Sequence, residues 1–91
     1  MKIVILGAGS IGGSVANELS TEENDVIVID NNQENLDSLN SKEGILTING
    51  NASSPATLSK ANLDKNTLLL CLTDSEEVNL LSSIIARSSF E

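Results

Sequence analysis

The 91 residues of this chain, of which 40% are hydrophobic, are enough for one small domain and no more. Phe90 is the only aromatic residue, so the core must be aliphatic and no aromatic platform exists for stacking nucleic-acid bases. Thirteen acidic and five basic residues give a net charge of −8, which repels phosphate backbones and anionic membrane surfaces and argues against nucleic acid as a partner.

Cysteine usage and hydropathy point to a cytosolic protein. Cys71 is the only cysteine, so an internal disulfide is excluded. It lies in the apolar run 68–72 without a basic residue or histidine nearby, and we expect a small core residue in a reducing compartment rather than a catalytic thiol. Because the chain shows no leader peptide and no apolar run of roughly 20 residues, direct membrane insertion is not expected.

The first part of the chain alternates short apolar runs with a helical pattern. Residues 2–6 form an apolar run that ends in glycines, which is typical of a parallel strand buried on both faces. Residues 12–20 carry apolar side chains at helical spacing and predict the first helix. The β-branched residues 26–29, closed by Asp30, predict the second strand.

Capping signals mark the next two helices. Asn31 followed by Glu34 resembles a capping box and predicts a short second helix. Residues 45–48 include a polar side chain, as expected for a third strand at the edge of a sheet. Ser54 at the N-cap and Pro55 at the first helical position predict a third helix. Two of its side chains should face inward, those of Leu58 and Ala61.

A continuous apolar run and an acidic turn predict the last two elements. Residues 67–72 read as a fourth strand. Either Asp74 or Ser75 can cap the helix that follows, and two glutamates in its first turn suit the helix dipole. Asn79, one turn into this helix, is expected to be a solvated or helix-capping polar residue rather than a ligand contact. The apolar side chains expected on the buried face are those of Val78, Leu81 and Ile85.

Four strands and four helices therefore alternate, which predicts an α/β fold of the Rossmann type. We expect a parallel sheet with strand order 3-2-1-4 and helices on both faces. No repeat or linker divides the chain, so residues 1–91 are expected to be the N-terminal portion of a single Rossmann nucleotide-binding domain. A fifth strand would normally cover the fourth, so we expect a domain truncated after its fourth βα unit, with dimerisation as a consequence.

The loop after the first strand carries the pattern G-x-G-x-x-G in Gly7-Ala8-Gly9-Ser10-Ile11-Gly12. The first glycine would make a tight turn, the second would let a pyrophosphate approach the backbone, and the third would let the helix pack on the sheet. Because Gly13 follows directly, the packing role stays open between Gly12 and Gly13. The free N–H groups of the helix N-terminus would face the phosphates.

Asp30 lies 18 residues after Gly12, at the end of the second strand. A carboxylate there accepts hydrogen bonds from ribose hydroxyls and repels a 2′-phosphate. No lysine or arginine follows Asp30 before Lys42, so NAD or an adenine nucleotide such as ATP or ADP is favoured over NADP. The alternative is a tight turn without ligand, in which Asp30 serves only as a helix cap.

Four segments together resemble the N-terminal domain of Trk-type potassium-uptake regulatory proteins: Met1-Lys2-Ile3-Val4-Ile5-Leu6-Gly7-Ala8-Gly9, Val28-Ile29-Asp30, Gly50-Asn51-Ala52-Ser53 and Leu72-Thr73-Asp74-Ser75-Glu76-Glu77-Val78-Asn79. This is a family of ring-forming domains that regulate potassium conductance, and the likeness covers essentially the whole chain. It implies a cytoplasmic homo-oligomeric protein, peripheral to the cell membrane, that binds NAD⁺, NADH or adenine nucleotides. Its partner would be the membrane subunit of a potassium transporter.

The resemblance also implies ligand contacts position by position. Residues Gly7 to Ile11 would contact the pyrophosphate, Asp30 the adenosine ribose, Asn51 and Ala52 the adenine side, and Thr73 with Asp74 the far end of the ligand. A threonine that ends a strand and an aspartate that caps a helix are also ordinary structural residues, so both interpretations of this last pair stay open. No catalytic or metal-ligating residue is assigned.

Three functions are compatible with these residues. A ligand-controlled switch needs no catalytic group, and it is the function we expect. An NAD-dependent oxidoreductase with its catalytic half elsewhere would use the same motif, although this chain has no histidine or tyrosine to act as acid or base. A nucleotide-free interaction module would instead work through the apolar edge beyond the fourth strand.

Overall fold

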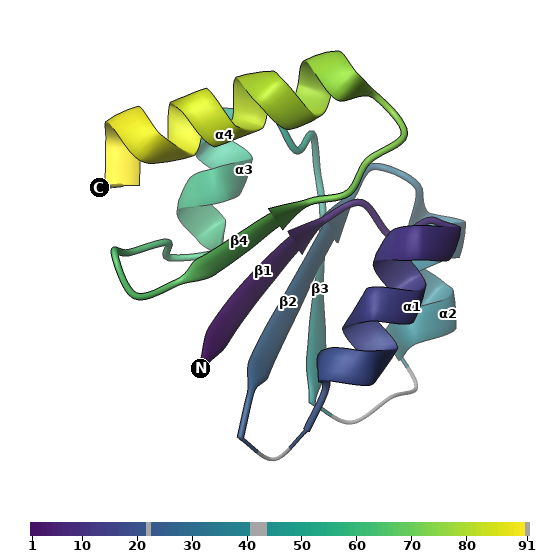
Figure 1. Ribbon diagram of the computed structural model, residues 1–91. Coiled ribbons are helices and arrows are strands. Elements are labelled where there is room, and N and C mark those ends of the chain that lie inside the picture. The colour runs from purple at the N-terminus through teal and green to yellow at the C-terminus, as the bar shows by residue number, and fades with distance from the viewer. Residues whose placement is uncertain (22, 41–43, 91) are drawn as a thin grey trace.

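The computed structural model describes residues 1–21, 23–40 and 44–90. Strands and helices alternate in the predicted order along this part of the chain (Figure 1). The elements are β1 (Lys2–Leu6), α1 (Ser10–Leu19), β2 (Asp25–Asp30), α2 (Gln33–Asn40), β3 (Ile45–Asn49), α3 (Pro55–Lys60), β4 (Leu68–Cys71) and α4 (Glu76–Phe90).

The four strands form one parallel sheet in the order β3-β2-β1-β4, which confirms the predicted topology. In the register of the central strand, Ile3 lies opposite Val26 on one side and opposite Leu68 on the other. Because all four strands point the same way, their carboxyl ends meet at one edge of the sheet (Figure 1). The loops that lead into the helices therefore gather at this edge.

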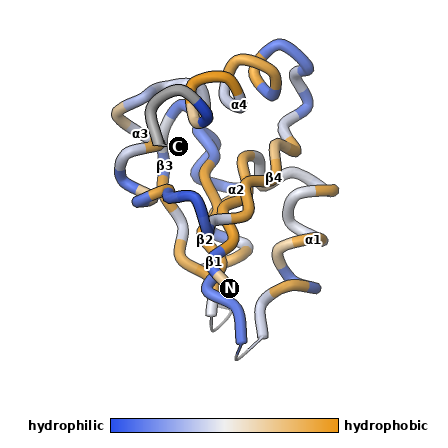
Figure 2. Tube along the Cα trace, turned by 60° about the vertical axis from the view of Figure 1, so that its left-hand side comes forward, coloured by the Kyte–Doolittle hydropathy of each residue, from blue (hydrophilic) through white to orange (hydrophobic). Residues whose placement is uncertain are grey.

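Strand β1 is the centre of the hydrophobic core. Its side chains alternate between the two faces, so Ile3 and Ile5 join one apolar cluster while Val4 and Leu6 join the other. Burying each such side chain contributes about 1.5–3 kcal/mol relative to leaving it in water. This double-sided burial explains why residues 3–6 of the strand are all apolar, and Figure 2 shows hydrophobic segments of the strands between the helices.

Helices cover both faces of the sheet, as predicted. Ala16 of α1 and Leu36 of α2 pack in the cluster with Ile3 and Ile5. Leu58 of α3 belongs to the opposite cluster, against which Val78 and Ile85 of α4 pack. Figure 1 shows the same division, with α1 and α2 on one side of the sheet and α3 and α4 on the other.

Two helix starts differ from the prediction. Helix α1 begins at Ser10 rather than at Gly12, and Gly9 is its N-cap residue. Helix α2 is capped by Asn32 rather than by Asn31. The Asn32 side-chain oxygen Oδ1 accepts the N–H groups of Glu34 at 2.9 Å and Asn35 at 3.3 Å.

Helix α3 begins at the predicted residue, but its N-cap side chain does not make the expected hydrogen bond. Ser54 is the N-cap residue in an extended conformation and Pro55 is the first helical residue, yet the Ser54 hydroxyl makes no capping hydrogen bond. Leu58 and Ala61 are fully buried, which confirms that they face inward.

Helix α4 is capped by Ser75, whose hydroxyl oxygen accepts the Val78 N–H at 3.2 Å. The predicted burial of Leu81 is wrong, because this side chain is 49% exposed. Ser82 takes its place on the buried face, where its hydroxyl donates a hydrogen bond to the Ala52 carbonyl at 2.9 Å. A polar residue can occupy this position because the interior provides an acceptor.

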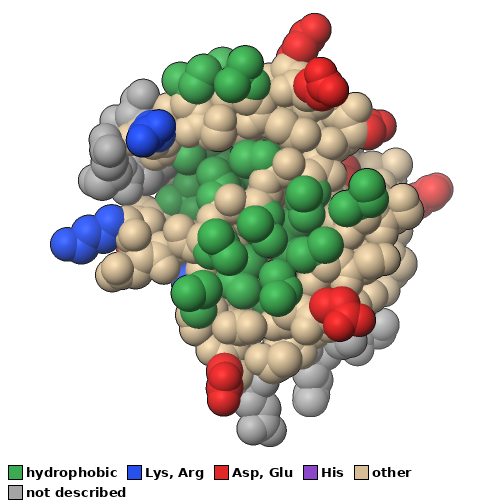
Figure 3. Space-filling view, in the orientation of Figure 1, with side chains coloured by type: hydrophobic (Ala, Val, Ile, Leu, Met, Phe, Trp, Pro, Cys, Tyr) green, Lys and Arg blue, Asp and Glu red, His purple; other side chains and the backbone are tan. Residues whose placement is uncertain are grey.

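Two apolar surfaces remain open to solvent in the described part of the chain. Strand β4 is an edge strand, and its first residue, Leu68, is exposed while the next three are half-buried. Figure 3 shows green side chains over this edge and a second row along α4. That row consists of Leu80, Leu81 and Ile84. Within residues 1–21, 23–40 and 44–90, no helix combines the length and apolar character needed to cross a bilayer.

Candidate functional site

A cleft of about 470 Å³ opens at the carboxyl ends of the strands. It is lined by residues from the loops after β1, β2, β3 and β4, which Figure 1 shows at one end of the sheet. Every predicted binding residue lines it except Ala8 and Gly12. Parallel α/β sheets characteristically bind ligands at this end, which makes the cleft the candidate site.

Two glycines of the loop after β1 are required by the fold itself. Gly7 has a φ of +106°, and a Cβ there would lie 2.8 Å from the Leu72 carbonyl oxygen. A Cβ on Gly12 would lie 1.9 Å from the Gly7 carbonyl oxygen, so the helix could not keep its position. On Gly13 a Cβ would make an ordinary contact of 3.5 Å with the Ala8 oxygen. Gly12 is therefore the packing glycine, which resolves the ambiguity left by the sequence.

Gly9 differs from these glycines because nothing in the protein excludes a side chain there. A Cβ on Gly9 would have no heavy atom within 4 Å, and its φ of −71° is open to any residue. Gly9 lines the cleft, and so do Ser10 and Ile11 at the start of α1. The first N–H groups of a helix lack intrahelical partners and carry partial positive charge, so the start of α1 is a place where an anionic group can bind.

Asp30 ties the glycine loop to the start of α2. Its carboxylate oxygen Oδ2 accepts the Ala8 N–H at 2.7 Å, and Oδ1 accepts the Asn32 N–H at 2.8 Å. Ala8 thus contributes to the site through its backbone rather than by lining the cleft. A carboxylate offers about four lone-pair positions, so two remain for ligand hydroxyls at the cleft wall.

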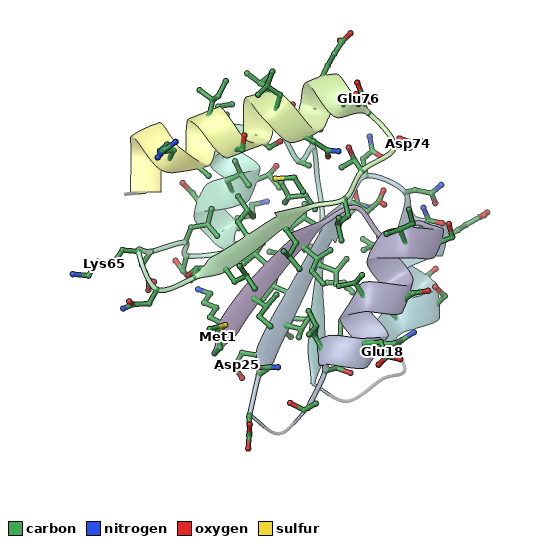
Figure 4. The ribbon with its side chains drawn as sticks, viewed as in Figure 1. Met1, Glu18, Asp25, Lys65, Asp74 and Glu76 are labelled. Carbon is green, nitrogen blue, oxygen red and sulfur yellow. The ribbon has the colours of Figure 1, made fainter. Side chains whose placement is uncertain are left out.

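The loop between β4 and α4 is held by a residue that the sequence did not assign to the site. Asn79 is half-buried, and its Oδ1 accepts hydrogen bonds from the Thr73 N–H at 3.0 Å and the Thr73 hydroxyl at 2.6 Å. The Asn79 amide also donates to the Thr73 carbonyl at 3.1 Å. The expectation of a solvated or helix-capping Asn79 is therefore wrong. The Thr73 hydroxyl also accepts the Ser75 N–H at 3.2 Å, whereas Asp74 is exposed (Figure 4).

The loop after β3 carries its own internal hydrogen bonds. The Asn51 side-chain oxygen accepts both the N–H of Ser53 at 2.9 Å and its hydroxyl at 2.8 Å. Ala52 is buried, and its carbonyl accepts the hydroxyl of Ser82 from α4. Asn51 and Ala52 both line the cleft, so α4 supports this wall as well as the neighbouring one.

The sequence matches the model of the TrkA-N domain family over residues 3–91. This chain belongs to the TrkA-N domain family. The resemblance carried by the glycine loop and the segments around Asn51 and Thr73 is thereby confirmed. The Rossmann-like parallel sheet with strand order 3-2-1-4 agrees with this membership.

The relatives that this chain matches are named as potassium uptake proteins. The chain is 38% identical over 90 residues to the Trk system potassium uptake protein TrkA of Halomonas elongata and to that of Vibrio alginolyticus. Each of these two matches covers 99% of this chain but 20% of the relative. A TrkA homolog of Pyrococcus horikoshii is 36% identical over 87 residues, which are 96% of this chain and 38% of that protein. The chain thus spans only part of each relative.

The charged side chains that line the cleft of this TrkA-N domain are acidic, namely Asp30 and Asp74. Among the described residues, no lysine or arginine lines it, and Figure 4 shows Lys65 at the far end of the molecule from Asp74. Lys42, the first cation after Asp30, lies outside the described residues. A bound phosphate would therefore depend on backbone N–H groups rather than on a cationic side chain.

Three asparagines of the TrkA-N cleft were missed from the sequence. Asn31, Asn32 and Asn35 line the wall beside Asp30. The available signal was the run of amide side chains directly after a strand that ends in an acidic residue. No group of three or more histidine, cysteine, aspartate or glutamate residues in the described ranges could hold a metal ion. Cys71 does not line the cleft, and burial raises the pKa of its thiol above the ordinary value of 9.0.

Proposed function

We propose that this TrkA-N domain binds an adenine nucleotide, NAD⁺, NADH, ATP or ADP, in the cleft at the carboxyl ends of its strands. The observation that carries the proposal is Gly9, since the fold does not need a glycine there and the space beside it belongs to the cleft. The pyrophosphate lies over the N-terminus of α1, and the Asp30 carboxylate accepts hydrogen bonds from the adenosine ribose. Asn51 and Ala52 face the adenine side, and Thr73 with Asp74 the far end.

The bound nucleotide acts as a regulatory signal for a potassium uptake transporter. The names of the relatives support this role, because they are called Trk system potassium uptake proteins. A nucleotide shifts the packing of neighbouring domains when it binds one arrangement more tightly than another, and this needs no chemical step. The domain works in the cytoplasm as part of a homo-oligomer that contacts the membrane subunit of the transporter.

Calorimetric titration with NAD⁺, NADH, ATP, ADP and NADP tests the binding. Asp30→Asn removes the negative charge of the carboxylate that accepts hydrogen bonds from the ribose hydroxyls. We expect this variant to bind the nucleotide roughly tenfold more weakly or worse. Asp25→Asn is the matched control, because it makes the same change at the opposite end of the same strand, where the side chain is exposed (Figure 4). Equal loss in both variants, or no binding to the unaltered domain, would contradict the proposal.

The regulatory role needs a test with the complete regulatory protein and its transporter. We expect nucleotide to change potassium flux in membranes that contain both, and Asp30→Asn to shift that response to higher nucleotide concentration. Consumption of NADH during the assay would instead support the oxidoreductase alternative. Flux that does not respond to any of the nucleotides would contradict the switch.

A further inference from the structure

Helix α4 holds two different walls of the cleft through polar side chains on one face. Asn79 makes three hydrogen bonds to Thr73 in the loop after β4. Ser82, three residues later and fully buried, donates to the carbonyl of Ala52 in the loop after β3. Residues three apart on a helix lie on the same side, so a single face of α4 reaches both loops.

Thr73 is the first residue beyond the hydrogen-bonded ladder between β1 and β4. The Leu72 N–H still bonds to the Leu6 carbonyl at 2.8 Å, but the sheet offers no partner to the next residue. Asn79 supplies those partners, since its amide group accepts the Thr73 N–H and donates to the Thr73 carbonyl. Both backbone groups of Thr73 are therefore held by one side chain of α4 at the point where the chain leaves the sheet.

The position of Thr73 matters because this residue abuts the glycine loop. A Cβ on Gly7 would lie 2.9 Å from the Thr73 Cα, so the two backbones touch. In the strand order β2-β1-β4, Asp30 and Thr73 lie on opposite sides of the glycine loop. A dinucleotide that lies across the carboxyl ends of the strands with its adenosine ribose at Asp30 therefore extends its other half toward Thr73.

We propose that Asn79 is a positioning residue of the nucleotide site, and this inference rests on the proposed function. It acts through Thr73: its amide holds the loop after β4 in the place that accommodates the half of the ligand farther from Asp30. The half nearer to Asp30 does not depend on it. Loss of Asn79 therefore changes which ligands bind well, whereas a merely structural residue would change binding of all ligands alike.

The test compares binding of NAD⁺ with binding of AMP, the half-ligand that reaches only the Asp30 side. For Asn79→Ala we expect roughly tenfold weaker binding of NAD⁺ and at most about a twofold change for AMP. Calorimetry gives both affinities, and urea unfolding gives the stability of each variant. If Asn79→Ala does not fold, Asn79→Asp replaces it, because that side chain keeps the acceptor and loses the donor to the Thr73 carbonyl.

Two controls separate positioning from general damage. Ser83→Ala changes an exposed residue of the same helix whose hydroxyl donates to the Leu80 carbonyl within α4, and it should leave both affinities unchanged. Ile3→Val destabilises the core at the opposite end of β1 and should likewise leave the ratio of the two affinities unchanged.

Each arm reports on a different claim. If the unaltered domain binds neither NAD⁺ nor AMP, the proposed function fails, and the role of Asn79 fails with it. If the unaltered domain binds both, the proposed function stands, and the variant decides the role of Asn79. An Asn79→Ala domain that keeps the normal affinity for NAD⁺, or that loses NAD⁺ and AMP in equal proportion, overturns the inference.

Discussion

Gly9 and Gly12 lie in one motif, but the packing of the protein requires a glycine only at the second of these two positions. The space at Gly12 is filled by the protein, whereas the space at Gly9 is open. We predict that Gly12→Ala lowers the free energy of unfolding by roughly 2–3 kcal/mol, because the new methyl group overlaps the Gly7 carbonyl. Gly9→Ala should cost about 1 kcal/mol or less, since alanine is only a poorer N-cap residue than glycine.

The same pair separates folding from binding. In Gly9→Ala the methyl group occupies the approach of the pyrophosphate, so NAD⁺ should bind roughly tenfold more weakly or worse while the domain remains folded. Urea unfolding and calorimetry measure the two effects. A Gly9→Ala domain that binds NAD⁺ normally would show that the phosphates lie elsewhere.

Cys71 provides a pH-dependent prediction. Burial raises the pKa of its thiol above the ordinary value of 9.0, so the unfolded chain loses this proton at lower pH than the folded one. The free energy of unfolding should therefore fall as the pH rises from 9.0 through the higher pKa of the folded thiol.

Urea unfolding across this pH range, with Cys71→Val as the reference, isolates the thiol from other titrating groups. The difference in stability between the two proteins should change steadily above the ordinary thiol pKa and stay constant below it. A constant difference throughout would mean that the thiol is as well solvated in the folded protein as in the unfolded chain.

At the level of elements, α4 depends on a buried polar contact. The hydroxyl of Ser82 satisfies the Ala52 carbonyl, and both groups lie in the interior. Ser82→Ala leaves that carbonyl without its partner and should lower the free energy of unfolding by about 1–3 kcal/mol. The matched variant Ser83→Ala, on the exposed side of the helix, should change it by no more than about 0.5 kcal/mol. Similar values for the two variants would show that the Ser82 bond contributes nothing.

Helices and strands could be predicted from the sequence where a single physical requirement, such as burial on both faces, determines the residue pattern. Strand β1 is buried on both faces, so its sequence contains a run of consecutive apolar residues that is atypical of a solvent-exposed segment. Helix α4 shows the limit, because apolar spacing alone selected Leu81 for the interior. Ser82 is buried instead, since a carbonyl from a loop 30 residues earlier in the chain accepts its hydroxyl.

The place of the cleft in the molecule could be predicted because the parallel topology brings its lining loops together. Once parallel strands are inferred, their carboxyl ends must meet, and Asp30 must lie beside the glycine loop. The role of Asn79 could not be inferred in the same way. Its bonds to Thr73 span six residues across a strand-to-helix turn, and no periodic pattern encodes that geometry.

The distribution of charge leads to a prediction about salt. The net charge is −8, and no described cationic side chain lines the cleft. A nucleotide held by backbone N–H groups gains little from long-range attraction, so raising KCl from about 50 to about 500 mM should leave the affinity for NAD⁺ unchanged or raise it by screening repulsion. Calorimetry at several salt concentrations measures this. A steep loss of affinity with salt would reveal a cationic contact to the phosphates.

A nucleotide site at the carboxyl ends of the strands can be tested by following the backbone amide signals of the domain by nuclear magnetic resonance while NAD⁺ is added. Binding in the cleft predicts that the largest shifts come from the start of α1, from the turn after Asp30 and from the loops that contain Ala52 and Thr73. Amides at the opposite ends of the strands should not move. Absence of shifts at saturating NAD⁺, or shifts confined to the β4 edge and the outer face of α4, would contradict a nucleotide site at the carboxyl ends of the strands.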